Sequence, residues 1–422
     1  MPLRILIHSL SYAPEQTGIG KYSGDMGPWF ASRGHEVHAI TGVPHYPEWR
    51  VHDGYKGSRY LSEEIEGVRV LRAPHFVPES TNVNAKTRIA LETSFSATGS
   101  RYWLPRLLFQ RRYDVVIAVC PPLQALVYPA LYASLRRTPW VAHIQDFQVD
   151  AAVRLGLLDG RLSSALYGVE GWLLRRASAV STITEAMRRR CVDKGVAEEK
   201  TMVFPNWADV DFVQPAERDN AFRRELGYDR DDVICLYAGN MGEKQGLELI
   251  LEVAGRMRDR TNVKFVLVGN GASRARLERQ ASEMNLANLQ FVDLQPWARV
   301  PEMLAAGDVH LIVQKEEAAD LVMPSKLTNT LAAGRCVVAT ASEGTALHQV
   351  VAECGVGLAC PPESADDLYD AVVELTSDSA RRVTMGHAAR DYAEKHLEKN
   401  AILERFERDL YALAQRSPDA AG

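Results

Sequence analysis

Residues 320–339 contain the side chains best suited to binding a phosphate group. Pro324 disfavours a helical conformation in the residue before it and fits a first helical turn itself, so we expect a helix to begin there. Gly334 can end that helix, and a short apolar run of strand type follows it. The helix start would present free backbone N–H groups, the Ser325 hydroxyl and the Lys326 ammonium together. This combination favours phosphate, although an ordinary helix with a surface lysine has the same pattern.

Two glycine-rich turns in the same half of the chain offer further donors. One covers residues 239–246 and the other residues 269–271, and each follows an apolar run that is typical of a buried strand. The carboxyl ends of parallel strands meet at one edge of a sheet, where backbone N–H groups and lysines can hold a diphosphate. The residues expected at this diphosphate site are Gly239, Asn240, Lys244, Gly269, Gly271, Ser325 and Lys326.

A third glycine-rich turn lies near the start of the chain, after an expected strand at residues 4–8. It lacks the third glycine of the dinucleotide fingerprint, and no acidic residue ends the next expected strand at residues 36–41. NAD binding is therefore not expected. The candidate ligand-binding residues of this turn are Thr17, Gly18, Gly20 and Lys21.

Acidic side chains follow another expected strand of the first half, residues 140–144. Asp146 and Asp150 come after this strand, and His143 lies within it. Ligands of open parallel sheets bind beyond the carboxyl ends of the strands, which makes all three residues candidates. A structural role is the alternative for each, and His143 could point into the sheet.

Strands and helices alternate in both halves of the chain. At 422 residues, the chain is longer than those that usually fold around a single hydrophobic core. This pattern predicts the α/β class, with two doubly wound Rossmann-like domains in tandem. We expect an N-terminal domain at residues 1–208 and a C-terminal domain at 209–392. A charged helical segment at 393–422 would follow and could pack back on the first domain.

The first residues resemble a strand rather than a signal peptide, and no run of 18 apolar residues occurs. The six cysteines are scattered without CxxC or zinc spacing, which is typical of reduced cysteines in a cytoplasmic protein. Asp209 and Asp211 match a short DxD metal-binding motif. Their position in an expected interdomain connection favours a structural role instead.

Charge is distributed unevenly along the chain. Residues 1–210 hold 25 Lys and Arg against 20 Asp and Glu, whereas the remainder holds 24 against 34. A basic first half suits an anionic ligand or an anionic membrane surface, and nothing indicates a nucleic-acid partner. Residues 86–113 mix aromatic, aliphatic and basic side chains as an interfacial helix does, although a pair of core helices would also explain them.

Two such domains would leave a cleft suited to a ligand with two chemically different halves, such as a nucleotide-sugar and its acceptor. Several segments resemble one known family: 14–20 (Pro-Glu-Gln-Thr-Gly-Ile-Gly), 33–37 (Arg-Gly-His-Glu-Val), 204–212, 239–240, 269–271 and 318–329. Over nearly its whole length the chain resembles GT-B glycosyltransferases of glycosyltransferase family 4. Residues 318–329 are most similar to the colanic acid biosynthesis subgroup of the fucosyltransferase type.

This resemblance implies retaining transfer of a sugar from a nucleoside diphosphate, GDP-fucose in that subgroup, to a lipid-diphosphate-linked saccharide. It implies no metal and no cofactor. Lys244 and Lys326 would neutralise the leaving phosphate, and Asp146 would bind sugar hydroxyls or stabilise an oxocarbenium-like centre. Further donor contacts are expected from Gly18, Gly20, Gly239, Asn240, Gly269, Gly271, Gln295, Ser325 and Asn329. Acceptor contacts are expected from Thr17, Lys21 and Asp150.

The chain departs from the family pattern at the ribose-binding position. Most members carry two glutamates eight residues apart, but this chain has Leu321 and Asn329 there. Either Asn329 binds ribose one helical turn from Lys326, or Glu316 and Glu317 take over; we favour the first. The missing glutamates keep a non-catalytic sugar-nucleotide-binding subunit open as an alternative, and a sugar-nucleotide 2-epimerase of the same fold is another.

Overall fold

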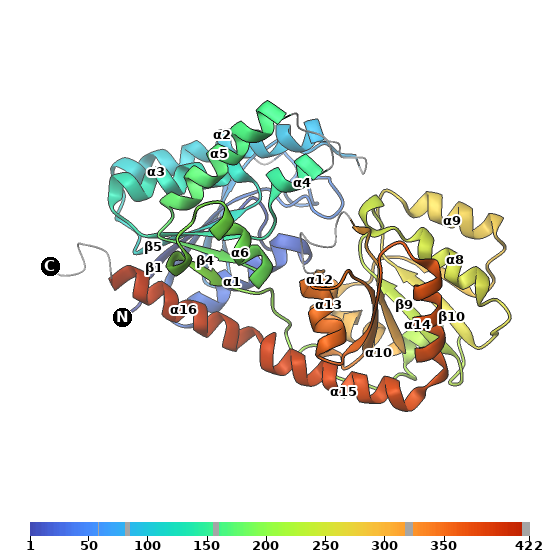
Figure 1. Ribbon diagram of the computed structural model, residues 1–422. Helices are drawn as coiled ribbons and strands as arrows, with labels where there is room; N and C mark the ends of the chain where they lie inside the picture. The colour runs from blue at the N-terminus through green and yellow to red at the C-terminus, as the bar shows by residue number, and fades with distance from the viewer. Residues whose placement is uncertain (58, 81–84, 155–159, 317–323, 416–422) are drawn as a thin grey trace. The chain divides into compact units, whose positions relative to one another are not determined.

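The computed structural model describes residues 1–57, 59–80, 85–154, 160–316 and 324–415. The chain divides into two compact units, Met1–Pro205 with Asn400–Gly422 and Asn206–Lys399 (Figure 1). The boundaries expected from the sequence lie after residues 208 and 392, whereas the two units divide after Pro205 and after Lys399. Each unit is an α/β domain built on a mainly parallel sheet, which confirms the predicted fold class.

The first unit contains an eight-stranded sheet in the order β3-β4-β2-β1-β5-β6-β7-β8. All neighbouring strands are parallel except β3, which pairs antiparallel with β4. The central strands are buried along their whole length because helices cover both faces, and this explains their continuous apolar sequences. The strands are β1 (Arg4–His8), β2 (Glu36–Gly42), β3 (Leu61–Ile65), β4 (Val68–Ala73), β5 (Val115–Cys120), β6 (Trp140–Ile144), β7 (Ala179–Thr182) and β8 (Thr201–Val203).

Helices of the first unit include the last helix of the chain. They are α1 (Gly18–Ser32), α2 (Ala85–Leu108), η1 (Leu123–Leu126), α3 (Val127–Arg136), α4 (Gln148–Arg154), α5 (Gly160–Arg176), α6 (Glu185–Asp193), η2 (Glu198–Lys200) and α16 (Lys399–Gln415). Helices α2, α3 and α5 lie side by side (Figure 1). Helix α16 is joined to the end of α1, because the Glu407 carboxylate accepts hydrogen bonds from Arg33 and lies 2.8 Å from His35.

The second unit contains a six-stranded parallel sheet in the order β11-β10-β9-β12-β13-β14. Its strands are β9 (Val233–Ala238), β10 (Val263–Val268), β11 (Leu289–Val292), β12 (Val309–Ile312), β13 (Cys336–Thr340) and β14 (Gly357–Cys360). Its helices are α7 (Ala221–Glu225), η3 (Glu243–Gln245), α8 (Glu248–Arg256), α9 (Arg274–Glu283), η4 (Trp297–Arg299), α10 (Val300–Ala306), α12 (Ser325–Ala332), α13 (Ala346–His348), η5 (Gln349–Glu353), α14 (Ala365–Ser377) and α15 (Ser379–His396).

Two hydrophobic clusters cover the two faces of the second sheet. One contains residues of α10, α12 and α15, among them Leu327 and Leu331 of α12. The other contains residues of α8, α9 and α14. Burying Leu327 and Leu331 on the same side orients α12, so that its first turn lies at the carboxyl edge of the sheet.

Some elements differ from the expectations. Strands β3 and β14 were not expected, because β3 is a half-exposed edge strand rich in glutamate and β14 is only four residues long and begins with a glycine. The helical segment expected at 393–422 contains the last turn of α15 and the whole of α16. Within the described residues, no helix is long and apolar enough to cross a bilayer.

Candidate functional site

The glycine turns after β9 and β10 interlock at the carboxyl edge of the second sheet. The Gly239 N–H donates to the Val268 carbonyl at 2.9 Å. A Cβ atom on Gly269 would lie 2.0 Å from the Gly239 carbonyl oxygen, and one on Gly271 would lie 2.5 Å from that of Met241. Gly239, Gly269 and Gly271 have φ values of 152°, 140° and 153°. Only glycine fits these positions, so the two turns form one closely packed backbone surface.

Lys326 reaches this surface from the first turn of α12. Its Nζ donates to the Tyr237 hydroxyl at 2.7 Å and lies 3.9 Å from the centre of that ring. The Tyr237 hydroxyl in turn donates to the Asn240 carbonyl at 2.6 Å. A Cβ on Gly239 would lie 3.2 Å from the Lys326 Nζ, which places the amine directly beside the turn. The structure therefore brings Lys326 and the glycine turns together at one point.

The electrostatics of Lys326 fit an anion-binding role. Burial lowers the pKa of Lys326 to about 7. Across the described ranges, no carboxylate forms an ion pair with it. Its ammonium form therefore lacks a compensating negative charge, which a bound phosphate would supply.

Asn329 lies one turn further along α12. Its side-chain Oδ1 is buried and has no hydrogen-bond partner within the part of the chain that the structure describes. A buried amide oxygen without a partner is costly, and a ligand hydroxyl would satisfy it. Ser325 is exposed at the start of the helix. Of the alternative glutamates, Glu316 is exposed, while Glu317 lies outside the described residues, as do Leu321 and the rest of 317–323.

Other expected donor residues lie at the rim of this edge. Lys244 is exposed in η3, and its carbonyl accepts a hydrogen bond from the Lys315 N–H at 3.0 Å. Asn240 is exposed in the turn after β9. Gln295 follows β11, and its Nε2 donates to the Asp293 carbonyl at 2.9 Å. These residues follow β9 and β11, the strands on either side of β10 in the sheet.

In the first unit, Thr17 occupies the N-cap position of α1. Its hydroxyl caps no helix N–H, and its Oγ1 is buried without a hydrogen-bond partner in the described chain. Gly18 has a φ of 58°, and a Cβ on Gly20 would lie 2.6 Å from Glu15. Lys21 is partly buried on the first turn of α1, 5.4 Å from the Tyr22 ring. The expected turn thus exists, with an unsatisfied hydroxyl beside it.

Asp146 and Asp150 have different surroundings. Asp146 is partly buried just beyond the end of β6. Asp150 is buried in α4 and forms ion pairs with Lys194 at 2.7 Å and with Arg190. Burial alone would raise its pKa, but these two cations hold the pKa of Asp150 below its usual range. Its carboxylate is occupied by these ion pairs, which hold α4 against α6. The expected contact between Asp150 and the acceptor saccharide stays a prediction.

His143 points into the interior of the first unit. It is buried, with Nδ1 at 2.9 Å from the Ser181 hydroxyl and Nε2 at 2.9 Å from the Gln145 amide nitrogen. Burial lowers the pKa of His143 to about 3, which keeps the ring neutral. We therefore assign His143 to the hydrogen-bonded core between β6 and β7.

Sequence reasoning missed Tyr237 and Glu15. Tyr237 is the last but one residue of β9, where its ring supports Lys326. Glu15 is buried, and its Oε1 accepts hydrogen bonds from the N–H groups of His45 and Tyr46, at 2.8 and 3.0 Å. Burial raises the pKa of Glu15. A polar aromatic residue near a strand end and an acid inside a glycine-rich turn are the signals that could have identified them.

The DxD motif has a structural explanation. The Asp209 Oδ1 accepts a hydrogen bond from the Phe212 N–H at 3.0 Å, and the Asp211 carbonyl accepts one from Gln214. In the portion of the chain that is described, no group of three or more His, Cys, Asp or Glu side chains could hold a metal ion. The six cysteines are free thiols, and all except Cys354 are buried.

Comparison with known proteins identifies the family. Residues 17–207 match the Glycosyl transferase 4-like domain, and residues 218–392 match Glycosyl transferases group 1. The chain is 38% identical over 419 residues to WcaI of Escherichia coli K12, which is named as a colanic acid biosynthesis glycosyl transferase; the match covers 97% of this chain and 100% of WcaI. The chain belongs to glycosyltransferase family 4. It is a transferase, as the sequence predicts.

Solved structures agree with the GT-B fold of this glycosyltransferase. HepE of Anabaena in complex with UDP has a TM-score of 0.72 at 16% identity, covering 97% of this chain and all of HepE. WaaG, a glycosyltransferase involved in lipopolysaccharide biosynthesis, has a TM-score of 0.66 at 15% identity, covering 98% of this chain and all of WaaG. The predicted GT-B architecture of the glycosyltransferase is confirmed.

Proposed function

We propose that this glycosyltransferase moves a sugar, with retention, from a nucleoside diphosphate to a lipid-diphosphate-linked saccharide in bacterial exopolysaccharide assembly. The observation that carries the proposal is the position of the Lys326 amine beside the interlocked turns of Gly239 and Gly269. The near full-length similarity to WcaI supports a product of the colanic acid type. The likeness to HepE, whose structure contains UDP, supports a nucleoside diphosphate donor.

In the proposed reaction, the bond between the sugar C1 and the leaving phosphate oxygen breaks, and a bond from C1 to the acceptor oxygen forms on the same face. The proton of the acceptor hydroxyl passes to the leaving phosphate. Lys326 neutralises the negative charge that develops on this phosphate, with backbone N–H groups of the glycine turns and Lys244 assisting. Asn329 holds the ribose through its Oδ1, which has no hydrogen-bond partner among the described residues. Asp146 contacts the sugar hydroxyls. This arrangement requires no bound metal.

We assign GDP-fucose as the favoured donor, following the similarity to the colanic acid subgroup. Base recognition would fall to the segment around Gln295, which lies beyond the end of β11. The acceptor would be held by the first unit, where Thr17 offers a buried hydroxyl without a partner among the described residues.

We further propose that the first unit contacts the inner face of an anionic membrane, where a lipid-linked acceptor resides. Helices α2, α3 and α5, with the residue that follows α2, carry large apolar side chains that are exposed, among them Leu104, Leu108, Phe109, Leu131, Leu135, Leu162, Val169 and Trp172. Phe109 is 84% exposed. Basic residues accompany them on the same segments: Arg101, Arg111, Arg112, Arg136, Arg137 and Arg176. Apolar and aromatic side chains with neighbouring arginines favour an anionic lipid interface.

A panel of UDP-, GDP- and dTDP-sugars, offered with and without a lipid-diphosphate saccharide, tests the reaction. We expect transfer from GDP-fucose that depends on the acceptor and proceeds without added divalent metal. Turnover of a sugar-nucleotide without any acceptor would indicate a 2-epimerase. Nucleotide binding with neither transfer nor donor hydrolysis would indicate a non-catalytic subunit. Either result would replace the proposal.

Flotation with liposomes tests the membrane contact separately. Wild-type protein should float with vesicles that contain anionic phospholipid and should float less with neutral vesicles. Phe109→Glu places a charge in the exposed apolar set and should reduce flotation. Val383→Glu is the matched control, since Val383 is a 59% exposed apolar residue on α15 of the other unit. Equal flotation of both variants, or no dependence on anionic lipid, would contradict the membrane contact.

A further inference from the structure

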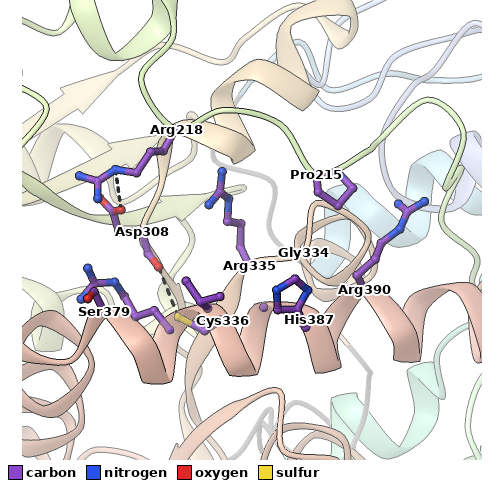
Figure 2. Close-up of a pocket in the computed structure, with 12 residues that line it drawn as sticks. Pro215, Arg218, Asp308, Gly334, Arg335, Cys336, Ser379, His387 and Arg390 are labelled. Carbon is purple, nitrogen blue, oxygen red and sulfur yellow. Dashed lines mark hydrogen bonds and ion pairs between the residues drawn. The ribbon is translucent and has the colours of Figure 1, made fainter.

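A cavity of about 340 Å³ lies within the second unit, at the amino edge of its sheet (Figure 2). The segment before α7 provides Pro215 and Arg218, the starts of β12 and β13 provide Asp308 and Arg335, and helix α15 provides the opposite side. The donor site lies at the other edge, beyond the carboxyl ends of the strands. The two sites are therefore at opposite edges of one sheet.

The lining of this cavity carries an excess of positive charge. Four arginines line it, namely Arg218, Arg335, Arg382 and Arg390, against the single carboxylate of Asp308. That carboxylate is already shared, because Arg218 lies 3.1 Å from one of its oxygens and the buried Arg223 lies 3.2 Å from the other. Asp308 therefore cannot neutralise the whole cluster.

The arginines differ in how far their donors are satisfied. Arg390 donates to the carbonyls of Val213 and Ala332 and pairs with Glu394, and Arg382 donates to the Leu375 carbonyl. Arg335 donates through one nitrogen to the Ala216 carbonyl at 2.6 Å. Its Nε is buried without a hydrogen-bond partner in the described part of the chain.

Arg335 thus keeps an unsatisfied donor in a site rich in cations. Burial lowers the pKa of Arg335; the Asp308 carboxylate opposes this shift, and the Arg218 charge adds a smaller contribution in the lowering direction. A bound anion would accept a hydrogen bond from the unpaired Nε–H of Arg335. It would also reduce the repulsion between the guanidinium groups. The planar guanidinium fork matches the geometry of phosphate oxygens. His387 of α15 adds a further polar group to the lining.

We propose that this cavity is a binding site for a phosphate group, carried by a small metabolite or present as free phosphate, and separate from the donor site. Its volume falls in the range of small-molecule sites. Arg335 is the primary contact, because Arg218 already donates to the Arg230 and Asp232 carbonyls and pairs with Asp308. The inference does not rest on the proposed transfer reaction, because it uses only residues at the amino edge of the second sheet.

Isothermal titration with inorganic phosphate and with a hexose phosphate tests this site on the full chain. The donor site also suits phosphate, so Lys326→Gln, which weakens phosphate binding there, serves as the reference for binding at the cavity. We expect Lys326→Gln to retain binding. Arg335→Gln should weaken it by about 10- to 100-fold, as expected for the loss of a charge-assisted contact. Similar affinity for both ligands would indicate free phosphate, and tighter binding of the hexose phosphate would indicate an organic ligand; either supports the site.

A second variant distinguishes a loss of phosphate binding from misfolding. Val383 is exposed and lines the cavity, so Val383→Glu introduces a carboxylate at its rim without removing a core contact. This carboxylate should compete with phosphate and abolish binding, while the melting temperature without ligand stays near that of the wild type. Unchanged phosphate affinity in both Arg335→Gln and Val383→Glu would overturn the proposal. Loss of all binding in Lys326→Gln would overturn it as well, because phosphate would then bind only at the donor site.

Discussion

The affinity for a nucleoside diphosphate should fall steeply as pH rises through 7, and Lys326 should cause this dependence. Its amine is held on Tyr237 at 2.7 Å, and burial lowers its pKa from 10.5 to about 7. The diphosphate binds the ammonium form. Above pH 7 the fraction of free protein in that form falls about tenfold per pH unit, so the dissociation constant should rise at the same rate.

The free energy of unfolding of the protein without ligand should rise with pH over the range in which the affinity for the diphosphate falls. Between pH 7 and 10.5 the native Lys326 has released a proton that the unfolded chain still binds. The unfolded state then binds more protons, so the free energy of unfolding rises with pH in this window. The replacement Lys326→Gln removes both trends. It should also lower kcat/KM by about 10- to 1000-fold, as expected for a lost charged contact to the leaving phosphate.

Calorimetric titration of GDP and UDP from pH 6 to 9, in wild type and in Lys326→Gln, measures the effect directly. Tyr237→Phe is the matched control for the position of the amine, because it removes the hydroxyl that accepts from Lys326 and keeps the ring. Identical slopes of affinity against pH in wild type and Lys326→Gln would refute the reasoning. Wild-type kinetics in Lys326→Gln would remove this residue from the site.

Three further predictions concern stability. Gly269→Ala should lower the free energy of unfolding by at least about 2 kcal/mol, because its Cβ would lie 2.0 Å from the Gly239 carbonyl; thermal unfolding should show no such loss for Gly168→Ala, which has open space. Asp150→Ala should cost about 1.5–3 kcal/mol in urea unfolding, since it removes one of the two carboxylates that pair with the buried Lys194 while the Glu170 pair remains. Although burial alone would raise it, hydrogen bonds from Arg33 and His35 hold the pKa of Glu407 below 4.5. Glu407→Gln should therefore be destabilised near pH 7, and its difference from wild type should shrink as pH falls below 4.5.

Much of the second unit could be predicted because its elements follow local rules. Pro324 and Gly334 mark the two ends of α12, and the structure has the helix at Ser325–Ala332 with Gly334 at a φ of 64°. The direction of Lys326 could not be predicted in this way. It depends on Tyr237, which is 89 positions away in the sequence and becomes a neighbour only when β9 and β12 pair. Long-range packing of this kind leaves no periodic signal.

Candidates in the first unit show the same limit. Asp146 and Asp150 look equivalent beyond one strand, yet Asp150 is paired with Lys194 of the chain after α6. The Arg335 cavity was not anticipated either, since its four arginines come from three separate segments and each resembles an ordinary surface charge. Side chains that gather from distant segments become recognisable only after the fold places them together.

The interlocked glycine turns also bear on how this enzyme could be altered. Because Gly239, Gly269 and Gly271 have no space for a side chain, a library that varies them would consist largely of misfolded proteins. Asn240 is exposed, and the Gln295 side chain donates to the nearby Asp293 carbonyl, so both tolerate substitution more readily than the glycines. A search for new donor preferences should vary these two rim positions and keep the glycine surface as a fixed platform.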